Sequence, residues 1–178
     1  MQAFFIILGA LIVLVLGLFI FSLFLPPAVK VTRSQVIAAP ADKIFPLVNS
    51  VRNWELWSPW KEQDPAIRIT YGEKESGAGA GYSWESNNRN VGKGHMIITE
   101  SRPDQYIATE TDFMAIGVAK GTFRFDPVQT GTLVTWSITC NMGQHPLRKV
   151  MGVLMDKWVG RDFEKGLKGI EKLVVRYS

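Results

Sequence analysis

The chain has 178 residues, and its 20 Lys and Arg against 16 Asp and Glu leave a formal net charge of +4. This excess is small and no recognised nucleic-acid-binding motif accompanies it, so nucleic acid is not a predicted partner. The single cysteine, Cys140, excludes an intramolecular disulfide, and two histidines are too few for a histidine-rich metal site.

The first 29 residues contain no charged side chain. Residues 3–25 form an apolar run whose only hydroxyl belongs to Ser22. A helix of these 23 residues is about 35 Å long, and the hydrocarbon core of a bilayer is about 30 Å thick. The run therefore predicts a single transmembrane helix. Residues 1–28, including the Pro-Pro exit, are expected to form an anchor that is separate from a domain of residues 29–178.

Two alternatives to a membrane span fit the run less well. A cleaved signal peptide would have a basic start, a shorter apolar run and a small-residue cleavage site, and a core helix of a soluble protein would have a polar face. Lys30, Arg33 and Lys43 follow the run, whereas no Lys or Arg precedes it. Because Lys and Arg favour the cytoplasmic side, we expect a single-pass membrane protein whose domain is cytoplasmic.

The first part of the domain predicts one strand and two short helical segments. Residues 29–38 alternate loosely and predict a strand. Residues 39–42 carry the signals of a helix start, and the helix is expected to reach about Ser50. Pro46 is expected to kink or cut this helix. A second short helical turn is expected at residues 53–57.

Short β-prone runs separated by turn residues predict six further strands, at residues 66–71, 80–86, 92–101, 105–113, 118–125 and 132–140. Residues 126–131 are expected to form a loop between the last two. In the run 118–125, small and aromatic residues alternate with Lys120, Thr122 and Arg124. This alternation predicts an antiparallel sheet with one buried face and one solvated face.

A long amphipathic helix is predicted to begin near Pro146 and to continue almost to the end of the chain. It carries eight Lys and Arg against four Asp and Glu, and Gly160 is expected to mark a bend in it. Three other glycines are expected to allow close packing on the sheet: Gly152, Gly166 and Gly169. The basic face either contacts anionic lipid headgroups or is an ordinary solvated face with pairs such as Glu164 and Lys168.

The order of these elements predicts an α+β domain in which a curved antiparallel sheet wraps around the long C-terminal helix. Four segments resemble the SRPBCC superfamily (START-like, polyketide cyclase/dehydrase-like): IAAPADKIF at 37–45, WELWSPW at 54–60, GTLVTW at 131–136 and FEKGLKGI at 163–170. The resemblance covers about residues 30–175. It implies a helix-grip fold with a cavity for an apolar or amphipathic small molecule. Members of the superfamily include lipid carriers, hormone binders, cyclases and co-chaperone-like domains, so the fold alone does not select the function.

Aromatic and Met side chains are the predicted lining of that cavity, because large apolar walls with few polar groups suit a hydrophobic ligand. The candidate ligand-binding residues are Trp54, Trp57, Trp84, Phe113, Phe123, Trp136, Met151, Met155 and Trp158. The alternative interpretation is that each of these residues simply belongs to the packed core.

Three functions remain open at this point: a membrane-anchored binder of a hydrophobic or lipid-like molecule, a cyclase or dehydratase-type enzyme that uses a pocket carboxylate, and an interaction module without a ligand. The candidate acids and bases are Glu85, Glu100, Glu110, Asp112 and His95. We expect all five to face solvent or to be satisfied locally. No GxSxG, HExxH, Walker or paired CxxC motif occurs, so no catalytic residue, metal or cofactor is predicted.

Overall fold

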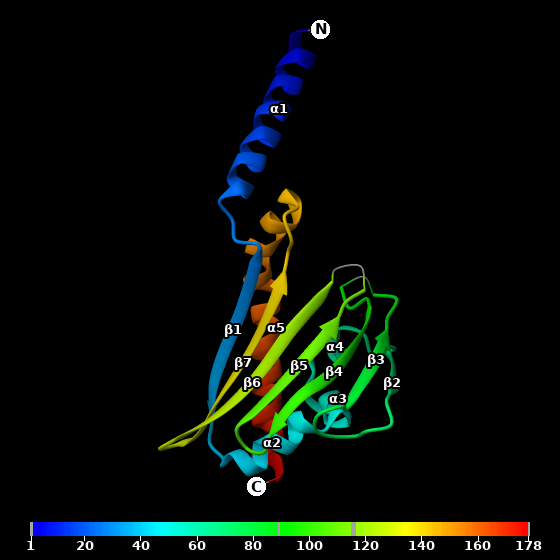
Figure 1. The fold of residues 1–178 in the computed structure, drawn as a ribbon, viewed down its shortest axis with the longest axis vertical. Helices are drawn as coiled ribbons and strands as arrows, with labels where there is room; N and C mark the ends of the chain where they lie inside the picture. The colour runs from blue at the N-terminus through cyan, green and yellow to red at the C-terminus, as the bar shows by residue number, and fades with distance from the viewer. Residues whose placement is uncertain (1, 89, 115–116, 178) are drawn as a thin grey trace.

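A computed structural model describes residues 2–88, 90–114 and 117–177. These residues form one seven-stranded antiparallel sheet with a long helix, α5, lying along one face, which confirms the α+β class (Figure 1). The strands are β1 Ala28–Ile37, β2 Arg68–Tyr71, β3 Gly81–Glu85, β4 Lys93–Arg102, β5 Tyr106–Asp112, β6 Val118–Val128 and β7 Gly131–Asn141. The helices are α1 Gln2–Leu23, α2 Ala41–Asn49, the 3-10 helix η1 Val51–Asn53, α3 Trp54–Trp57, α4 Pro59–Gln63 and α5 Pro146–Tyr177.

The sheet has the strand order β1-β7-β6-β5-β4-β3-β2. Strands β2 to β6 each pair with the next strand along the chain, and β1 pairs with β7 over its whole length. The short helices α2, α3 and α4 lie between β1 and β2 in the sequence and contact α5. The sheet and these helices therefore enclose α5 from two sides, as expected for a helix-grip fold.

The buried core lies beneath the C-terminal half of α5, residues 159–177. Four apolar residues of this half are at most 5 % exposed: Phe163, Leu167, Ile170 and Val174. Trp136 from β7 stacks on Phe163 with ring centroids 3.8 Å apart, and Phe123 from β6 stacks on Trp136 at 4.8 Å. Gly166 permits this approach, because a Cβ at that position would lie 2.7 Å from Trp136 Cζ3. Aromatic rings thus fill the space between this half of α5 and the sheet.

Arg33 on β1 ties the middle of α5 to the edge of the sheet. Its guanidinium donates hydrogen bonds to Asp156 Oδ1 at 2.9 Å and to Glu164 Oε1 at 2.8 Å. Between these two acids, α5 continues through Gly160, where a Cβ would lie 2.0 Å from Arg33 Nη2. The glycine expected to mark a bend therefore makes room for the guanidinium within a continuous helix.

Two prolines of the α2–α4 segment lie within helices. Pro46 does not cut α2, which continues to Asn49, and the Pro46 carbonyl accepts hydrogen bonds from the Ser50 N–H at 3.2 Å and from the Asn53 side chain at 3.0 Å. Pro59 begins α4, where its missing N–H is not needed.

The expected loop at residues 126–131 is wrong, because β6 continues to Val128 and pairs there with Gly131. Only Gln129 and Thr130 lie between β6 and β7. Pro127 is tolerated in the strand because the Phe125 N–H, which points to the same side, makes the last hydrogen bond toward β5. Among the described residues, no strand pairs with β6 on this side beyond that point, so no further N–H donor is needed there.

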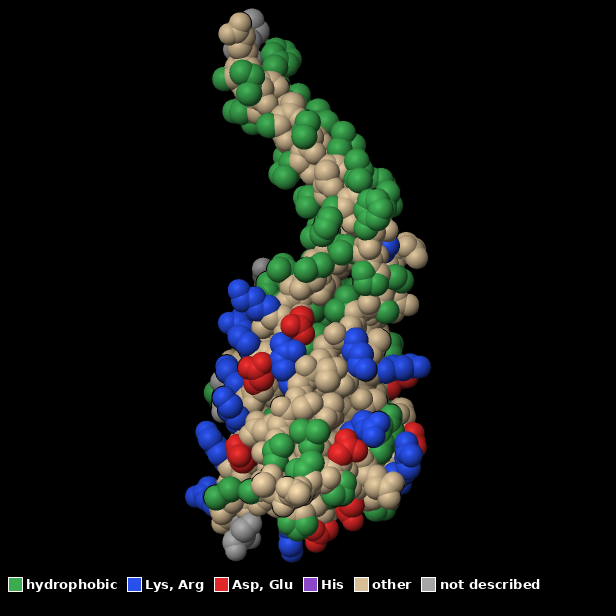
Figure 2. Space-filling view, turned by 90° about the vertical axis from the view of Figure 1, so that its left-hand side faces the viewer, with side chains coloured by type: hydrophobic (Ala, Val, Ile, Leu, Met, Phe, Trp, Pro, Cys, Tyr) green, Lys and Arg blue, Asp and Glu red, His purple; other side chains and the backbone are tan. Residues whose placement is uncertain are grey.

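α1 projects away from the domain and is long and apolar enough, by length and composition, to cross a membrane (Figure 1). Its side chains are exposed except for Ser22, whose hydroxyl donates to the Phe19 carbonyl at 2.6 Å. Only residues 24–27 separate α1 from β1, and the Met142 N–H donates to the Pro27 carbonyl at 2.7 Å. Figure 2 shows that hydrophobic side chains continue from α1 onto the adjoining end of the domain.

Candidate functional site

A cavity of about 1160 Å³ lies between the sheet and α5. Trp136 and Phe163, the stacked pair of the core, form one boundary of the cavity. From there the cavity extends toward the α1 end of the domain, where Met142 and residues 90–93 line it. The cavity borders α5 from Arg148 to Lys165. Part of the N-terminal half, residues 146–158, still packs on the sheet, because a Cβ at Gly152 would lie 2.6 Å from Val29 Cγ2.

A row of aromatic rings forms one wall of the cavity. Trp54 from α3 contacts Tyr82 from β3 with ring centroids 6.2 Å apart. Tyr82 contacts Trp84 at 5.9 Å, and Trp84 contacts Phe113 at 5.8 Å. Each ring holds the next one in place, because tilted and edge-to-face contacts of this kind are favourable. The wall is consequently rigid, apolar and continuous from the floor of the cavity to the α1 end.

The wall opposite the aromatic row contains more flexible side chains. Met151, Met155 and Trp158 project from α5 into the cavity, and Ile138 and Cys140 face them from β7. Burial raises the pKa of the Cys140 thiol, so this group stays protonated and acts as a small apolar surface. Because Met side chains adapt to irregular shapes, this wall can adjust to a ligand while the aromatic wall stays fixed.

A polar cluster lies at the edge of the cavity where α3, α4 and β2 meet. The Glu55 carboxylate accepts hydrogen bonds from Lys61 and from the Tyr71 hydroxyl. The hydrogen bond from Lys61, followed by that from Tyr71, lowers the pKa of Glu55. Burial, followed by the Glu55 hydrogen bond, raises the pKa of Tyr71. Glu55 thus stays ionised and engaged at neutral pH, which makes it a poor proton donor to a ligand.

Tyr82 is the polar group in the aromatic wall. Burial raises the pKa of its hydroxyl, which keeps the hydroxyl neutral. Among the residues that the structure describes, this hydroxyl has no hydrogen-bond partner, although the ring lines the cavity. It is therefore a donor available to a molecule in the cavity.

Charged groups of α5 lie along the rim of the cavity. Asp162 accepts a hydrogen bond from Gln63 at 3.2 Å, and burial raises the pKa of its carboxyl. Arg148, Arg161 and Lys165 line the same rim, and within the described part of the chain none of these three forms a salt bridge. The rim is therefore predominantly basic, whereas the interior is apolar.

The family model described as "Polyketide cyclase / dehydrase and lipid transport" matches residues 28–175 of the chain. The chain belongs to this family. The match covers the sheet and almost all of α5 and leaves out α1. No match was found among curated proteins.

Solved structures share the fold of this polyketide cyclase/dehydrase family member at low sequence identity. The di-domain ARO/CYC StfQ from the steffimycin biosynthetic pathway has a TM-score of 0.62 and 11% identity, over 84% of this chain and 52% of that one. Ara h 8.0201 has a TM-score of 0.61 and 17% identity, over 84% and 99%. Protein MLL2253 from Mesorhizobium loti has a TM-score of 0.59 and 14% identity, over 84% and 98%. These likenesses show the helix-grip fold, and the family match identifies the domain as SRPBCC-type.

Seven of the nine predicted ligand-binding residues of this family member line the cavity: Trp54, Trp84, Phe113, Trp136, Met151, Met155 and Trp158. Trp57 and Phe123 do not line it, because both are packed within the core. The Trp57 indole N–H donates to the Leu47 carbonyl at 2.8 Å, and Phe123 is fully buried against Trp136. Sequence alternation identified the correct face but not the depth at which each ring lies.

The predicted acids and bases of the strands lie outside the cavity. His95, Glu85, Glu100 and Glu110 are exposed, and His95 Nδ1 lies 3.2 Å from the Ser83 hydroxyl. Asp112 accepts a hydrogen bond from the Met114 N–H at 2.7 Å. The expectation that these groups are solvated or satisfied locally is confirmed. The carboxylates that do reach the cavity, Glu55 and Asp162, come from helices, where no motif distinguishes them from ordinary surface acids.

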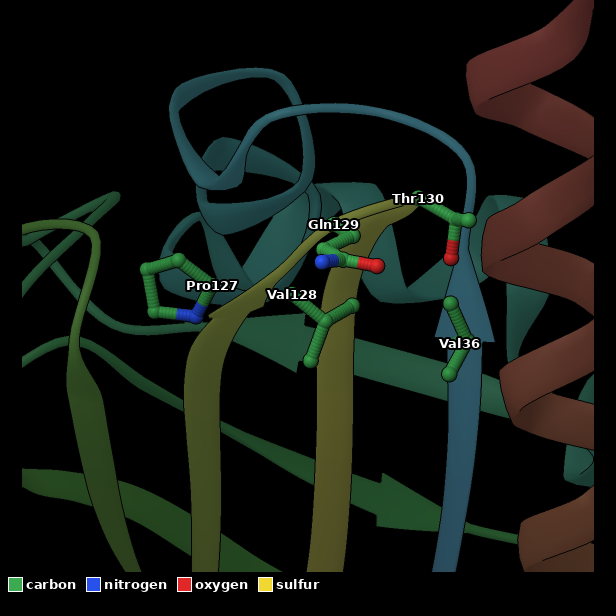
Figure 3. A pocket seen from close by; sticks show the side chains of 5 residues that line it. All are labelled: Val36, Pro127, Val128, Gln129 and Thr130. Atoms are coloured by element: carbon green, nitrogen blue, oxygen red, sulfur yellow. The ribbon is translucent and has the colours of Figure 1, made fainter.

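A second depression lies beside the turn between β6 and β7 (Figure 3). It is lined by Val36, Pro127, Val128, Gln129 and Thr130, none of which is charged or titratable. Two adjacent strand ends and the turn make up this shallow surface feature, so it offers no chemistry comparable to that of the cavity.

Proposed function

We propose that this protein binds a hydrophobic or lipid-like small molecule in the cavity while α1 holds the domain at a membrane. The cavity carries the proposal, because its volume of about 1160 Å³ is bounded mainly by apolar side chains, many of them aromatic or Met. Ligand pockets are commonly about 300–1,000 Å³ and mostly apolar. A space of this size suits a long-chain or multi-ring molecule, and the family description, which names lipid transport, supports the same class.

The proposed ligand contacts are the seven predicted residues that line the cavity, together with Tyr82. The aromatic wall would hold the apolar body of the ligand, and the Met side chains of α5 would close over it. The Tyr82 hydroxyl would donate a hydrogen bond to a polar group of the ligand, which gives the site one orienting contact among apolar ones.

The proposed anchor is α1, and residues 29–178 form the proposed binding domain. The exposed apolar surface of α1 and its projection from the domain support this division. Lys30, Arg33 and Lys43 follow α1, so the same proposal places the domain in the cytoplasm. An anchored domain meets apolar ligands at a lipid surface, where their concentration is far higher than in water.

Native mass spectrometry of the full chain, released from nanodiscs, tests the binding proposal. We expect a bound apolar molecule on the wild-type protein and a reduced bound fraction for Met155→Trp, because the indole would occupy part of the cavity. Val175→Trp is the matched control, because Val175 is exposed on the same helix and does not line the cavity. A chain that is consistently empty, or equal occupancy in both variants, would contradict the proposal.

A cyclase or dehydratase-type enzyme is a second candidate, and Asp162 is the observation that favours it. This carboxyl lines the cavity and burial raises its pKa, as a general acid or base requires. The test compares the molecules recovered from wild type and Asp162→Asn after expression in the same cells. An enzyme predicts that the variant retains a substrate that differs from the product in its connectivity or by one water. Identical molecules from both proteins would leave binding alone.

A further inference from the structure

The large hydrophobic side chains that the domain leaves exposed gather at the end nearest α1. Six of them form a set that we call the apolar rim: Met114, Val118, Leu147, Met151, Val153 and Leu154. Elsewhere on the domain, Val36 and Val128 share the shallow depression beside the β6–β7 turn, and Leu56 belongs to α3. Single exposed apolar residues are normal, whereas a gathered set marks an interaction surface.

The strand register explains why the rim lies beside α1. The pairings place the ends of four strands, β1, β5, β6 and β7, at the same end of the sheet. Ala28 lies opposite Asn141, Ala119 opposite Cys140, and Asp112 opposite Val118. Four residues connect α1 to β1, and four connect β7 to α5, so both helices adjoin this end of the sheet (Figure 1). α1 also contacts α5 directly. The apolar rim and the end of α1 nearest the domain therefore lie on the same side of the molecule.

Within the rim, the first turns of α5 have the character of a helix that lies at a membrane surface. Leu147, Met151 and Leu154 are spaced four and three residues apart, which places them on one face of the helix. Arg148 and Lys157, exposed on the same helix, flank this face. An exposed apolar face bordered by basic residues is typical of helices that bind anionic lipid surfaces. Met151 also lines the cavity, so the face forms one lip of the cavity mouth.

We infer that the apolar rim docks on the bilayer that α1 spans, so that the cavity opens directly into lipid. The inference rests on the proposed anchoring, because only a spanning α1 brings this end of the domain to the bilayer. α1 decides the occupant of the rim, since four connecting residues leave the domain little freedom to move away from the lipid surface. A ligand then enters from the membrane without crossing water.

Depth-dependent quenching in nanodiscs of phosphatidylcholine and phosphatidylglycerol tests the inference on the full chain. The fluorophore NBD is attached to single cysteines introduced by Leu147→Cys or Met114→Cys in a Cys140→Ser background. Val128→Cys is the matched control, because Val128 is an exposed apolar residue at the opposite end of the sheet. Ile12→Cys reports on α1 itself. We expect lipids that carry a doxyl quencher to quench the labels at 12, 114 and 147, and aqueous iodide to quench the label at 128.

The outcomes separate the docking inference from the proposals on which it rests. If the label at 12 is lipid-quenched but those at 114 and 147 behave like the label at 128, docking is wrong and anchoring stands. If the label at 12 is not lipid-quenched, anchoring itself is wrong and docking with it. Labels at 114 and 147 that are shielded from both quenchers contradict docking and indicate a protein partner or a second copy instead. The ligand proposal is independent, because native mass spectrometry tests it separately.

Discussion

The two halves of α5 carry similar apolar spacing but lie in different surroundings. In residues 159–177, the apolar face is at most 5 % exposed at Phe163, Leu167, Ile170 and Val174. In residues 146–158, the corresponding face is 44–64 % exposed at Leu147, Met151, Leu154 and Trp158. A repeating apolar pattern identifies a face that avoids water, but it does not say whether protein, ligand or lipid covers that face.

The difference arises from what lies beneath each half. Below the C-terminal half, α3 and β7 supply Trp57 and Trp136, which stack or pack directly against the helix. Below the N-terminal half, the sheet supplies the same kind of side chain, Trp84 and Phe113, but these rings border the cavity. The α5 residues that line the proposed binding site lie between Arg148 and Lys165, whereas beyond Lys165 the apolar face of the helix packs on the core.

The sharpest test of this comparison truncates one apolar residue in each half. Phe163→Ala should lower the free energy of unfolding by about 3–5 kcal/mol, because it removes a fully buried ring that stacks on Trp136. Leu147→Ala should change it by no more than about 0.5 kcal/mol, because Leu147 is exposed. Denaturant unfolding of the full chain in detergent measures both. A Leu147→Ala cost equal to that of Phe163→Ala would remove the distinction between the halves.

The junction between the halves can be tested at Gly160. Gly160→Ala should destabilise the protein by no more than about 1 kcal/mol, because the new methyl group would displace the flexible end of the Arg33 side chain from two half-exposed carboxylates. In a solvated helix the same substitution is stabilising, so the sign itself is informative. In an Arg33→Ala background the cost should disappear, as a double-mutant cycle would show. An unchanged cost in that background would locate the clash elsewhere.

The binding role of the aromatic wall can be tested through its hydroxyl group, which belongs to Tyr82. Tyr82→Phe should weaken binding of parinaric acid, a fluorescent fatty acid, by about 1 kcal/mol or roughly fivefold in Kd. Tyr71→Phe is the matched control, because the Tyr71 hydroxyl already donates to Glu55. Fluorescence titration measures both variants. Equal losses for the two variants would argue against a ligand contact specific to Tyr82.

The smallest expected effect is the opposite pH response of the two cavity carboxylates. The folded-state pKa of Glu55 is lowered, so its stabilisation is present above the unfolded pKa and is lost as pH falls through the folded pKa. The folded-state pKa of Asp162 is raised, so ionised Asp162 costs stability; that cost is absent below the unfolded pKa, develops as pH rises from the unfolded to the folded pKa, and is complete above the folded pKa. Glu55→Gln should therefore lower stability at neutral pH and Asp162→Asn should raise it, each by less than about 1 kcal/mol.

Urea midpoints measured between neutral pH and about pH 3 test both signs. The Asp162→Asn advantage should shrink as the medium becomes acidic, because protonation removes the same charge. The Glu55→Gln deficit should also shrink, but at lower pH. A deficit that stays constant at every pH would show that Glu55 acts through packing and not through its charge.

Local sequence patterns predicted most of the strands and the sheet faces. Alternation in β6 placed Ala119, Phe123 and Phe125 on the buried face, and all three are buried. The limits appeared where a partner strand decides the outcome. Pro127 looked like part of a loop, yet it belongs to β6 because it pairs with Thr132 of β7. A proline is tolerated there because the pairing of β6 with β5 stops at Arg124. A local sequence pattern contains no information about which strands will pair with each other.

The candidate site was predictable by residue type and face but not by depth or polar contact. Trp54 and Trp57 lie three residues apart in one short helix, yet only Trp54 reaches the cavity. The cluster of Glu55, Lys61 and Tyr71 joins three elements, and no spacing in the sequence connects them. Its detection required the positions of α4 and β2 relative to α3.

By itself, the sequence determined the N-terminal apolar helix, the antiparallel sheet and the long final helix. It also indicated that aromatic and Met side chains would line the cavity. Hydrophobic periodicity and turn chemistry depend on a few neighbouring residues, and they can therefore be recognised in the sequence. Only the tertiary structure decided where α5 rests on rings and where it leaves space. That outcome depends on how the sheet curves beneath the helix, which is a property of all the strand pairings together.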